Sequence, residues 1–157
     1  MRGGHGKAIT ELTQYLRDLK RGRVERADAL LVAIDANCKG YTEAQADIAK
    51  TIQQAQLDID PIYAIPDPHL EHWLLSDSAA FKAVFKVGCQ APDEKCERDR
   101  YKKLLREAIL KAGINPPLGG IEYAEDLAKA LDLHLKTDKS PRRLLDDLRT
   151  LFNRWQK

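Results

Sequence analysis

Asp35 and Asn37 stand two residues apart, directly after the continuous apolar run Leu30–Ile34. The segment 28–35 is too short for a helix and predicts a strand buried on both faces, as in parallel sheets. In open α/β sheets, ligands bind at the carboxyl ends of such strands. A carboxylate and an amide oxygen at this spacing can coordinate one hard cation such as Mg²⁺. The same residue types also form turns and cap helices, so a purely structural role is an equal alternative.

His69 and Glu71 follow a second predicted strand, Pro61–Ile65, which Pro66 and Pro68 end. If the two strands are neighbours in a parallel sheet, their following loops leave from the same edge. We therefore expect the carboxyl carbons of Asp35 and Glu71 to lie within about 8 Å, sharing one Mg²⁺ or Mn²⁺ ion. The alternative is that Glu71 only stabilises the amino terminus of a helix.

The charges along the 157 residues are distributed unevenly, although the net charge is only +2. Residues 27–77 hold two lysines against nine acidic residues, whereas residues 1–26 hold seven basic residues against three acidic ones. An acidic centre with basic flanks suits a cation-dependent enzyme that acts on a polyanion, because carboxylates hold the metal and lysines or arginines hold phosphates. Charged faces that are merely solvated would give the same counts.

The order of elements predicts an α/β fold. We expect a short parallel sheet with helices on both faces and a helical carboxyl-terminal part. All of residues 1–157 should form a single domain, with an α/β core at 1–90 and a helical part at 91–157 packed on it. Thr42 is expected to cap the helix between the strands, and Asp67 to cap one beginning at Pro68. Helices are predicted at 5–19, 42–57, from 68 onward, 79–86, up to about 113, around 124–131 and from 140 onward.

Two further segments are candidates for function. Lys102, Lys103 and Arg106 belong to a strongly basic helix that could contact nucleic-acid phosphates, although ordinary surface ion pairs explain it as well. Glu122 and Tyr123 follow the paired glycines 119–120, which permit close backbone approach, so these side chains could reach a cleft. Helix capping is the alternative for Glu122 and Tyr123.

Three segments, 30–37, 64–75 and 118–124, resemble bacterial proteins with Toprim-like domains, relatives of the overcoming-lysogenization-defect nucleases found in phage-defence loci. The resemblance implies a Rossmann-like fold that binds Mg²⁺ through an acid after its first strand and a D-x-D pair after a later one, and that cleaves phosphodiesters. Asp35 matches the first acid of that pair, and Asn37 stands where the second should be. No strand and glutamate corresponding to the first Toprim acid precede His5.

The sequence thus predicts a Mg²⁺-dependent, Toprim-like phosphodiesterase or nuclease, with phage defence as its setting. Asp35 would bind the metal, Asn37 would complete its shell, Glu71 would be a second ligand or the base for water, and His69 would contact a phosphate or the attacking water. The alternative is a non-catalytic Toprim-like interaction module that works with a partner protein, for example an ATPase encoded nearby. No apolar run reaches the length of a membrane span and residues 1–6 hold no apolar signal segment, so we expect a cytoplasmic protein without membrane contact.

Overall fold

A computed structural model describes residues 4–93, 95–97, 99–132 and 139–156. Contacts divide the chain into two units: unit 1 comprises residues 1–67 and 140–157, and unit 2 comprises residues 68–139. The described residues form seven α-helices and a two-stranded parallel sheet, which confirms the α/β class. The last helix, which begins at Ser140, belongs to unit 1 because it packs against the second strand. None of the described helices combines the length and apolar character needed to cross a membrane.

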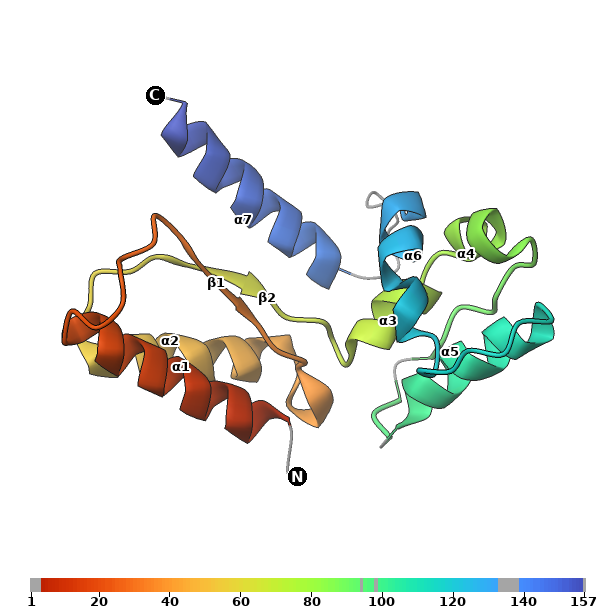
Figure 1. The fold of residues 1–157 in the computed structure, drawn as a ribbon, viewed down its shortest axis with the longest axis horizontal. Helices are drawn as coiled ribbons and strands as arrows, with labels where there is room; N and C mark the ends of the chain where they lie inside the picture. Colours follow the sequence, from red (N-terminus) through yellow and green to blue (C-terminus); the bar gives the residue numbers. More distant parts are fainter. Residues whose placement is uncertain (1–3, 94, 98, 133–138, 157) are drawn as a thin grey trace. The chain divides into compact units, whose positions relative to one another are not determined.

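Unit 1 is built around the parallel pair β1 (Leu30–Ala33) and β2 (Pro61–Ala64). The connection between them runs through the short 3₁₀ helix η1 (Asn37–Lys39) and through α2 (Tyr41–Ala55). Helix α1 (His5–Lys20) packs beside α2 on one face of the sheet (Figure 1). The core of this face contains the following buried apolar residues: Leu12, Leu16, Val32, Ile34, Ala44, Ile48, Ile52 and Ile65.

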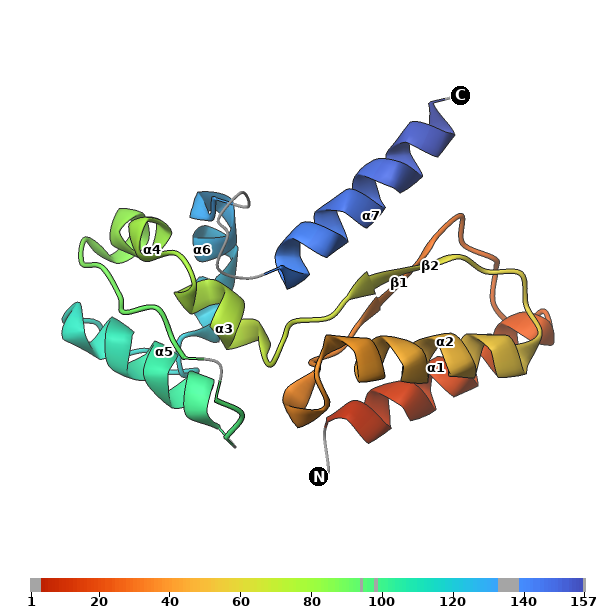
Figure 2. The ribbon, with the colours of Figure 1, turned by 180° about the vertical axis from the view of Figure 1, so that it is seen from behind.

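Helix α7 (Ser140–Trp155) covers β2 from the other side of the sheet, opposite α1 and α2 (Figure 2). The guanidinium of Arg143 lies 4.2 Å from the centre of the Tyr41 ring, a cation–π contact. Near the end of the helix, Arg154 makes a 2.6 Å ion pair with Asp60. Helices therefore lie on both faces of the sheet, as expected.

Two predicted helix starts are wrong, and both errors involve Asp67. Helix α2 begins at Tyr41 with Gly40 rather than Thr42 as its N-cap residue. Helix α3 (Leu70–Leu75) begins two residues after Pro68, and its N-cap residue is His69. The Asp67 carboxylate accepts a hydrogen bond from the Tyr41 amide (3.0 Å), so it caps α2 across the sheet edge instead of the helix that follows it in sequence.

Unit 2 contains α3, α4 (Ser78–Phe85), α5 (Arg100–Lys111), the 3₁₀ helix η2 (Ile121–Tyr123) and α6 (Ala124–Ala130). These helices enclose a core of their own, made of the following buried side chains: Leu74, Leu75, Phe81, Phe85, Leu105, Ile109 and Leu127.

Asp77 joins two elements of unit 2. Its buried carboxylate accepts hydrogen bonds from the amides of Ala79 and Ala80, which begin α4, and from the amide of Asp132 after α6. Burial by itself raises the pKa of Asp77, but these backbone hydrogen bonds outweigh it and lower the pKa below its ordinary value. The ionised group therefore stabilises the fold above pH about 4, and this contribution is lost as the pH falls through the lowered pKa.

Gly120 is required by the core of unit 2, and this requirement gives a first prediction. Its φ is +105°, and a Cβ atom there would lie 2.6 Å from Cδ1 of Ile109 and 2.9 Å from Cγ of Leu105. Gly120→Ala should therefore lower the free energy of unfolding by about 2–4 kcal/mol, through backbone strain and overpacking. Gly119→Ala is the matched control, because Gly119 has a φ of +79° but open space around a Cβ. Denaturant unfolding measures the free energy of unfolding of both variants. Equal losses in the two variants would contradict this account.

Candidate functional site

The carboxyl ends of β1 and β2 remain paired beyond the strands themselves. The Ile34 amide donates to the Ala64 carbonyl (3.1 Å), and the Ala36 amide donates to the Pro66 carbonyl (2.8 Å). The loops that follow the two strands therefore leave the sheet side by side. This arrangement confirms the predicted parallel pairing and brings together the residues that follow each strand.

Asp35 and Asn37 lie in the loop after β1, and both are partly buried. Asn37 has a φ of +53°, a left-handed conformation that asparagine tolerates better than most residues. Its side-chain amide donates a 2.9 Å hydrogen bond to the backbone carbonyl of Asp35. Asn37 therefore forms a turn, which was the structural alternative to metal binding. Its amide oxygen takes no part in this hydrogen bond.

Asp67 is a further carboxylate at the same edge, and the sequence predicts only a helix-capping role for it. It follows β2 directly, and its chain neighbour Pro66 accepts the hydrogen bond from Ala36. One carboxylate oxygen of Asp67 accepts from the Tyr41 amide, and the second oxygen is not used in that bond. The β1–β2 register places Asp67 beside the Asp35 loop, so its position follows from the strand pairing rather than from any local motif.

His69 and Glu71 belong to unit 2, whereas Asp35 and Asn37 belong to unit 1. The structure describes each unit by itself, so the expected approach of Asp35 to Glu71 stays a prediction. Glu71 lies in the first turn of α3, is 9% exposed, and makes no hydrogen bond or ion pair with the described residues. A buried carboxylate without such a partner is a candidate for function.

The surroundings of α3 in unit 2 are aromatic. The ring of Tyr101 lies 5.8 Å from that of His69 and 5.3 Å, edge-on, from that of buried His72. The Tyr101 hydroxyl lies 2.7 Å from the carbonyl of Asp93 and 2.8 Å from that of Lys95, which fixes the ring. His69 therefore has a ring neighbour that restricts its orientation.

A second polar cluster in unit 1 joins α1, η1 and α2. His5 Nε2 and Lys39 Nζ each lie 2.8 Å from the same carboxylate oxygen of Asp47. The hydrogen bonds from Lys39 and His5 lower the pKa of Asp47, and the bond to Asp47 raises the pKa of Lys39. A lysine that stays protonated therefore stands two residues after Asn37. No local sequence pattern connects residues 5, 39 and 47, so this cluster could not be predicted from the sequence.

The oxygen donors at the sheet edge suit Mg²⁺ better than a softer metal. Among the described residues, no group of three or more His, Cys, Asp or Glu side chains is arranged to hold a metal ion. Mg²⁺ does not need such a group, because proteins usually bind it through one or two carboxylates, with water and substrate phosphates completing the shell. Asp35, Asn37 and Asp67 are the residues with side-chain carboxylate or amide oxygens that directly follow β1 and β2.

The predicted nucleic-acid-binding residues lie on the exposed side of α5. Lys102, Lys103 and Arg106 are exposed, while Tyr101 and Leu105 face the core of unit 2. Lys102 has a long 3.9 Å ion pair with Asp99. The helix therefore presents three cations to solvent, and phosphate contact by these side chains stays a prediction.

Glu122 and Tyr123 take part in the fold of unit 2. The Glu122 carboxylate accepts hydrogen bonds from the amides of Leu118 (3.1 Å) and Gly120 (2.9 Å). Desolvation raises the pKa of Glu122, but its backbone hydrogen bonds outweigh this and lower it. Tyr123 packs edge-on against Phe85, with ring centres 5.1 Å apart. These contacts give both residues a structural role, in a loop for Glu122 and in ring packing for Tyr123, and a role in a cleft stays a prediction.

Comparison with known proteins yields no match to a family model, to a curated protein or to a solved structure. The Toprim resemblance therefore remains a hypothesis that rests on three short segments, 30–37, 64–75 and 118–124.

The capping role of Asp67 gives a second prediction. Asp67→Ala should lower the free energy of unfolding by about 1–2 kcal/mol, because the Tyr41 amide loses its acceptor and the loop after β2 loses its bond to α2. Asp67→Asn is the matched variant, since its amide oxygen can still accept, and it should lose less than half as much. Urea unfolding in the presence of a chelator measures this effect without any metal contribution. Equal losses in the two variants would argue against the cap.

Proposed function

We propose that the carboxyl edge of the β1–β2 sheet binds Mg²⁺ or Mn²⁺ and that the protein is a Toprim-like phosphodiesterase acting on nucleic acid. The observation that carries this proposal is the pairing of the two loops through Ala36 and Pro66, which brings oxygen donors from both strand ends to one edge. In α/β sheets this edge is where ligands bind.

The metal would be held by Asp35 and Asp67, with the Asn37 amide oxygen completing the protein part of the shell. A bound Mg²⁺ would polarise a phosphoryl oxygen and neutralise charge that develops during hydrolysis. Lys39, held by Asp47, is placed two residues after Asn37 to contact a phosphate.

Phosphodiester hydrolysis also requires a water oxygen to attack phosphorus, a base to take the proton of that water, and a leaving oxygen that departs with a proton. Glu71 is the candidate base, since it is a buried carboxylate with no partner among the described residues. His69 is the candidate phosphate contact. Both assignments come from the sequence and stay predictions.

A second candidate function is a non-catalytic module that acts through a partner protein. The observation that favours it is that β1 pairs on one side only, which leaves part of the sheet bare in the described structure.

Metal binding at the sheet edge gives a third prediction. Mg²⁺ or Mn²⁺ at about ten times its dissociation constant should stabilise the wild type by about 1.4 kcal/mol, a rise of roughly 3–5 °C in melting temperature. Asp35→Ala should abolish the rise and also any Mn²⁺-dependent cleavage of single- or double-stranded DNA. Asp58→Asn is the matched control, because Asp58 is an exposed acid at the opposite end of β2, and this variant should respond like the wild type.

Substitutions of Asn37 extend the same melting-temperature test, because one of them should strengthen metal binding. Asn37→Asp supplies the second carboxylate of a D-x-D pair and should lower the Mg²⁺ concentration needed for half the shift by about tenfold. Asn37→Gly keeps the left-handed backbone but removes the amide oxygen, so it should raise that concentration. A melting temperature that no divalent cation changes, in wild type and Asn37→Asp alike, would exclude the metal site and favour the non-catalytic module.

The basic side of α5 gives a fourth prediction. If Lys102, Lys103 and Arg106 contact phosphates, replacing all three with Gln should weaken nucleic-acid binding and reduce the slope of log K against log salt by about three. Fluorescence anisotropy with a labelled oligonucleotide at several salt concentrations measures the slope.

The matched control replaces three other exposed lysines of unit 2, Lys82, Lys86 and Lys111, by Gln. It removes the same charge, so a general electrostatic effect would alter both triple variants equally. An unchanged slope in the α5 variant would assign its three cations to the solvated surface.

A further inference from the structure

Among the described residues, strand β1 forms its ladder hydrogen bonds with β2 only. The amides of Ile34 and Ala36 donate toward β2 and its following loop. Because backbone groups alternate along a strand, the amides and carbonyls of Leu31 and Ala33 point away from β2. No described residue forms a hydrogen bond with these outward groups. The outer edge of β1 is thus a free row of donors and acceptors, which is the pattern that an added strand satisfies.

One face of the same strand is bare as well. Leu31 is paired in register with Ile62, and Ala33 with Ala64, so these four side chains share the face on which α7 lies. Ile62 and Ala64 are 5% and 9% exposed, whereas Leu31 is 48% exposed. Helix α7 therefore covers β2 and leaves β1 open. Parallel sheets are normally covered on both faces, so this half of the sheet lacks a neighbour.

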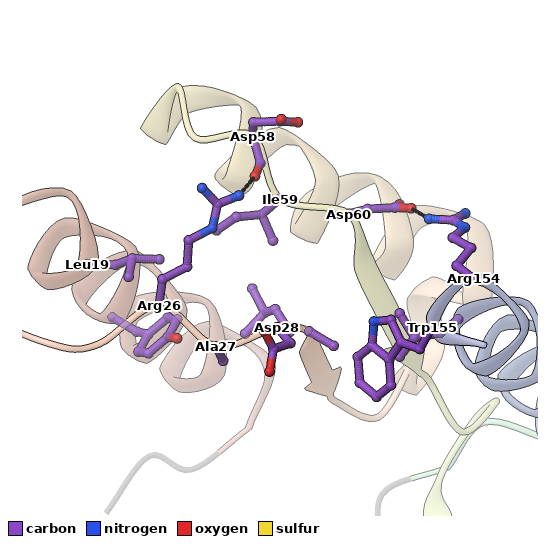
Figure 3. Close-up of a pocket in the computed structure, with 13 residues that line it drawn as sticks. Leu19, Arg26, Ala27, Asp28, Asp58, Ile59, Asp60, Arg154 and Trp155 are labelled. Atoms are coloured by element: carbon purple, nitrogen blue, oxygen red, sulfur yellow. Dashed lines mark hydrogen bonds and ion pairs between the residues drawn. The ribbon is translucent and has the colours of Figure 1, made fainter. Parts of the chain in front are cut away.

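A pocket of about 400 Å³ opens at the beginning of β1. Leu30, Ile59 and Leu151 contribute apolar walls, and the indole of Trp155, which is 55% exposed, lies at the side (Figure 3). A pocket of this size with an exposed aromatic ring next to a strand edge can receive one long side chain of an added strand.

The charged groups around this pocket favour a cation. Both arginines are occupied, since Arg26 donates to the Asp58 carbonyl (2.6 Å) and Arg154 pairs with Asp60 (2.6 Å) (Figure 3). The carboxylates of Asp28 and Asp58 make no hydrogen bond or ion pair with the described residues. The pocket lining holds three carboxylates, Asp28, Asp58 and Asp60, against the two guanidiniums of Arg26 and Arg154, so its balance is negative. Negative charge beside an indole face attracts Lys or Arg side chains.

We propose that the β1 edge and this pocket together bind an extended segment of a partner protein, which adds a strand beside β1 and places a Lys or Arg side chain in the pocket. Apolar residues of the segment would cover Leu31 and Ala33. The mode is strand addition, in which main-chain hydrogen bonds give affinity and a side-chain pocket gives specificity. It does not depend on the metal site, which uses side chains beyond the other end of the strand.

A second copy of this chain fits the edge poorly. Antiparallel pairing through the outward groups of β1 would set Leu31 of each copy opposite Ala33 of the other. Asp35 of each copy would then lie opposite Ala29, the chain neighbour of Asp28, so acidic residues would gather at both ends. Like charges that are close at the ends of a strand pair repel each other and weaken it. A segment with basic ends meets the same two acids favourably.

Two labelled heptapeptides test the proposal with the full chain, by fluorescence anisotropy. The first, Arg-Val-Thr-Val-Thr-Val-Lys, has basic ends, and the second has Glu at both ends. The basic peptide should bind at least tenfold more tightly. Ala33→Pro should weaken its binding at least tenfold, because the lost amide points outward and the bonds to β2 remain.

The melting curve of Ala33→Pro shows whether this variant is folded. If it is not, a charge-reversal variant tests the proposal independently. Asp28→Lys should lower affinity for the basic peptide and raise it for the acidic one, whereas Asp126→Lys, an exposed acid of unit 2, should change neither. Equal binding of both peptides, or no effect of Asp28→Lys, would overturn the proposal. Sedimentation showing a dimer that Ala33→Pro dissociates would instead assign the edge to a second copy.

Discussion

Backbone pairing between the segments that follow β1 and β2 is the constraint on which the candidate site depends. The hydrogen bond from the Ala36 amide to the Pro66 carbonyl continues the pairing of the two chains beyond the last residue pair of the sheet. The hydrogen bond from the Tyr41 amide to the Asp67 carboxylate connects the loop after β2 to α2. Together they place Asp35, Asn37 and Asp67 at one edge. A parallel pair needs a crossover helix, so α2 supplies both the connection and the amide that Asp67 caps.

A sheet of two parallel strands satisfies its backbone groups on one side of each strand only, and this limit shapes the rest of unit 1. Helices α1 and α2 bury Val32 and Ile34 on one face, while α7 packs mainly on β2 on the other. The exposed Leu31 and the outward amides of β1 are the result. The same strand thus ends in a candidate metal site and carries a bare edge, so a catalytic and a partner-binding role are compatible.

Unit 2 has a different basis for its stability. Its helices are short, and tertiary contacts rather than helix length hold them. Gly120 lets the chain pass against Leu105 and Ile109, and Asp77 joins the start of α4 to the segment after α6. These contacts leave Lys103 and Arg106 outside the core and Glu71 inside it, so the unit presents a basic helix face and one buried carboxylate without a partner among the described residues.

The sequence by itself determined the two strands, their order and the positions of most helices, because an apolar run of five residues and an apolar spacing of three to four are local signals. It also placed Asp35 and Asn37 after the first strand. Tertiary structure alone decided that Asp67 caps α2 rather than its own helix, that His5 and Lys39 share Asp47, and that α7 packs on β2 while Leu31 of β1 stays exposed. Each of these depends on segments at least eight and up to about eighty residues apart, whose pairing no local spacing encodes.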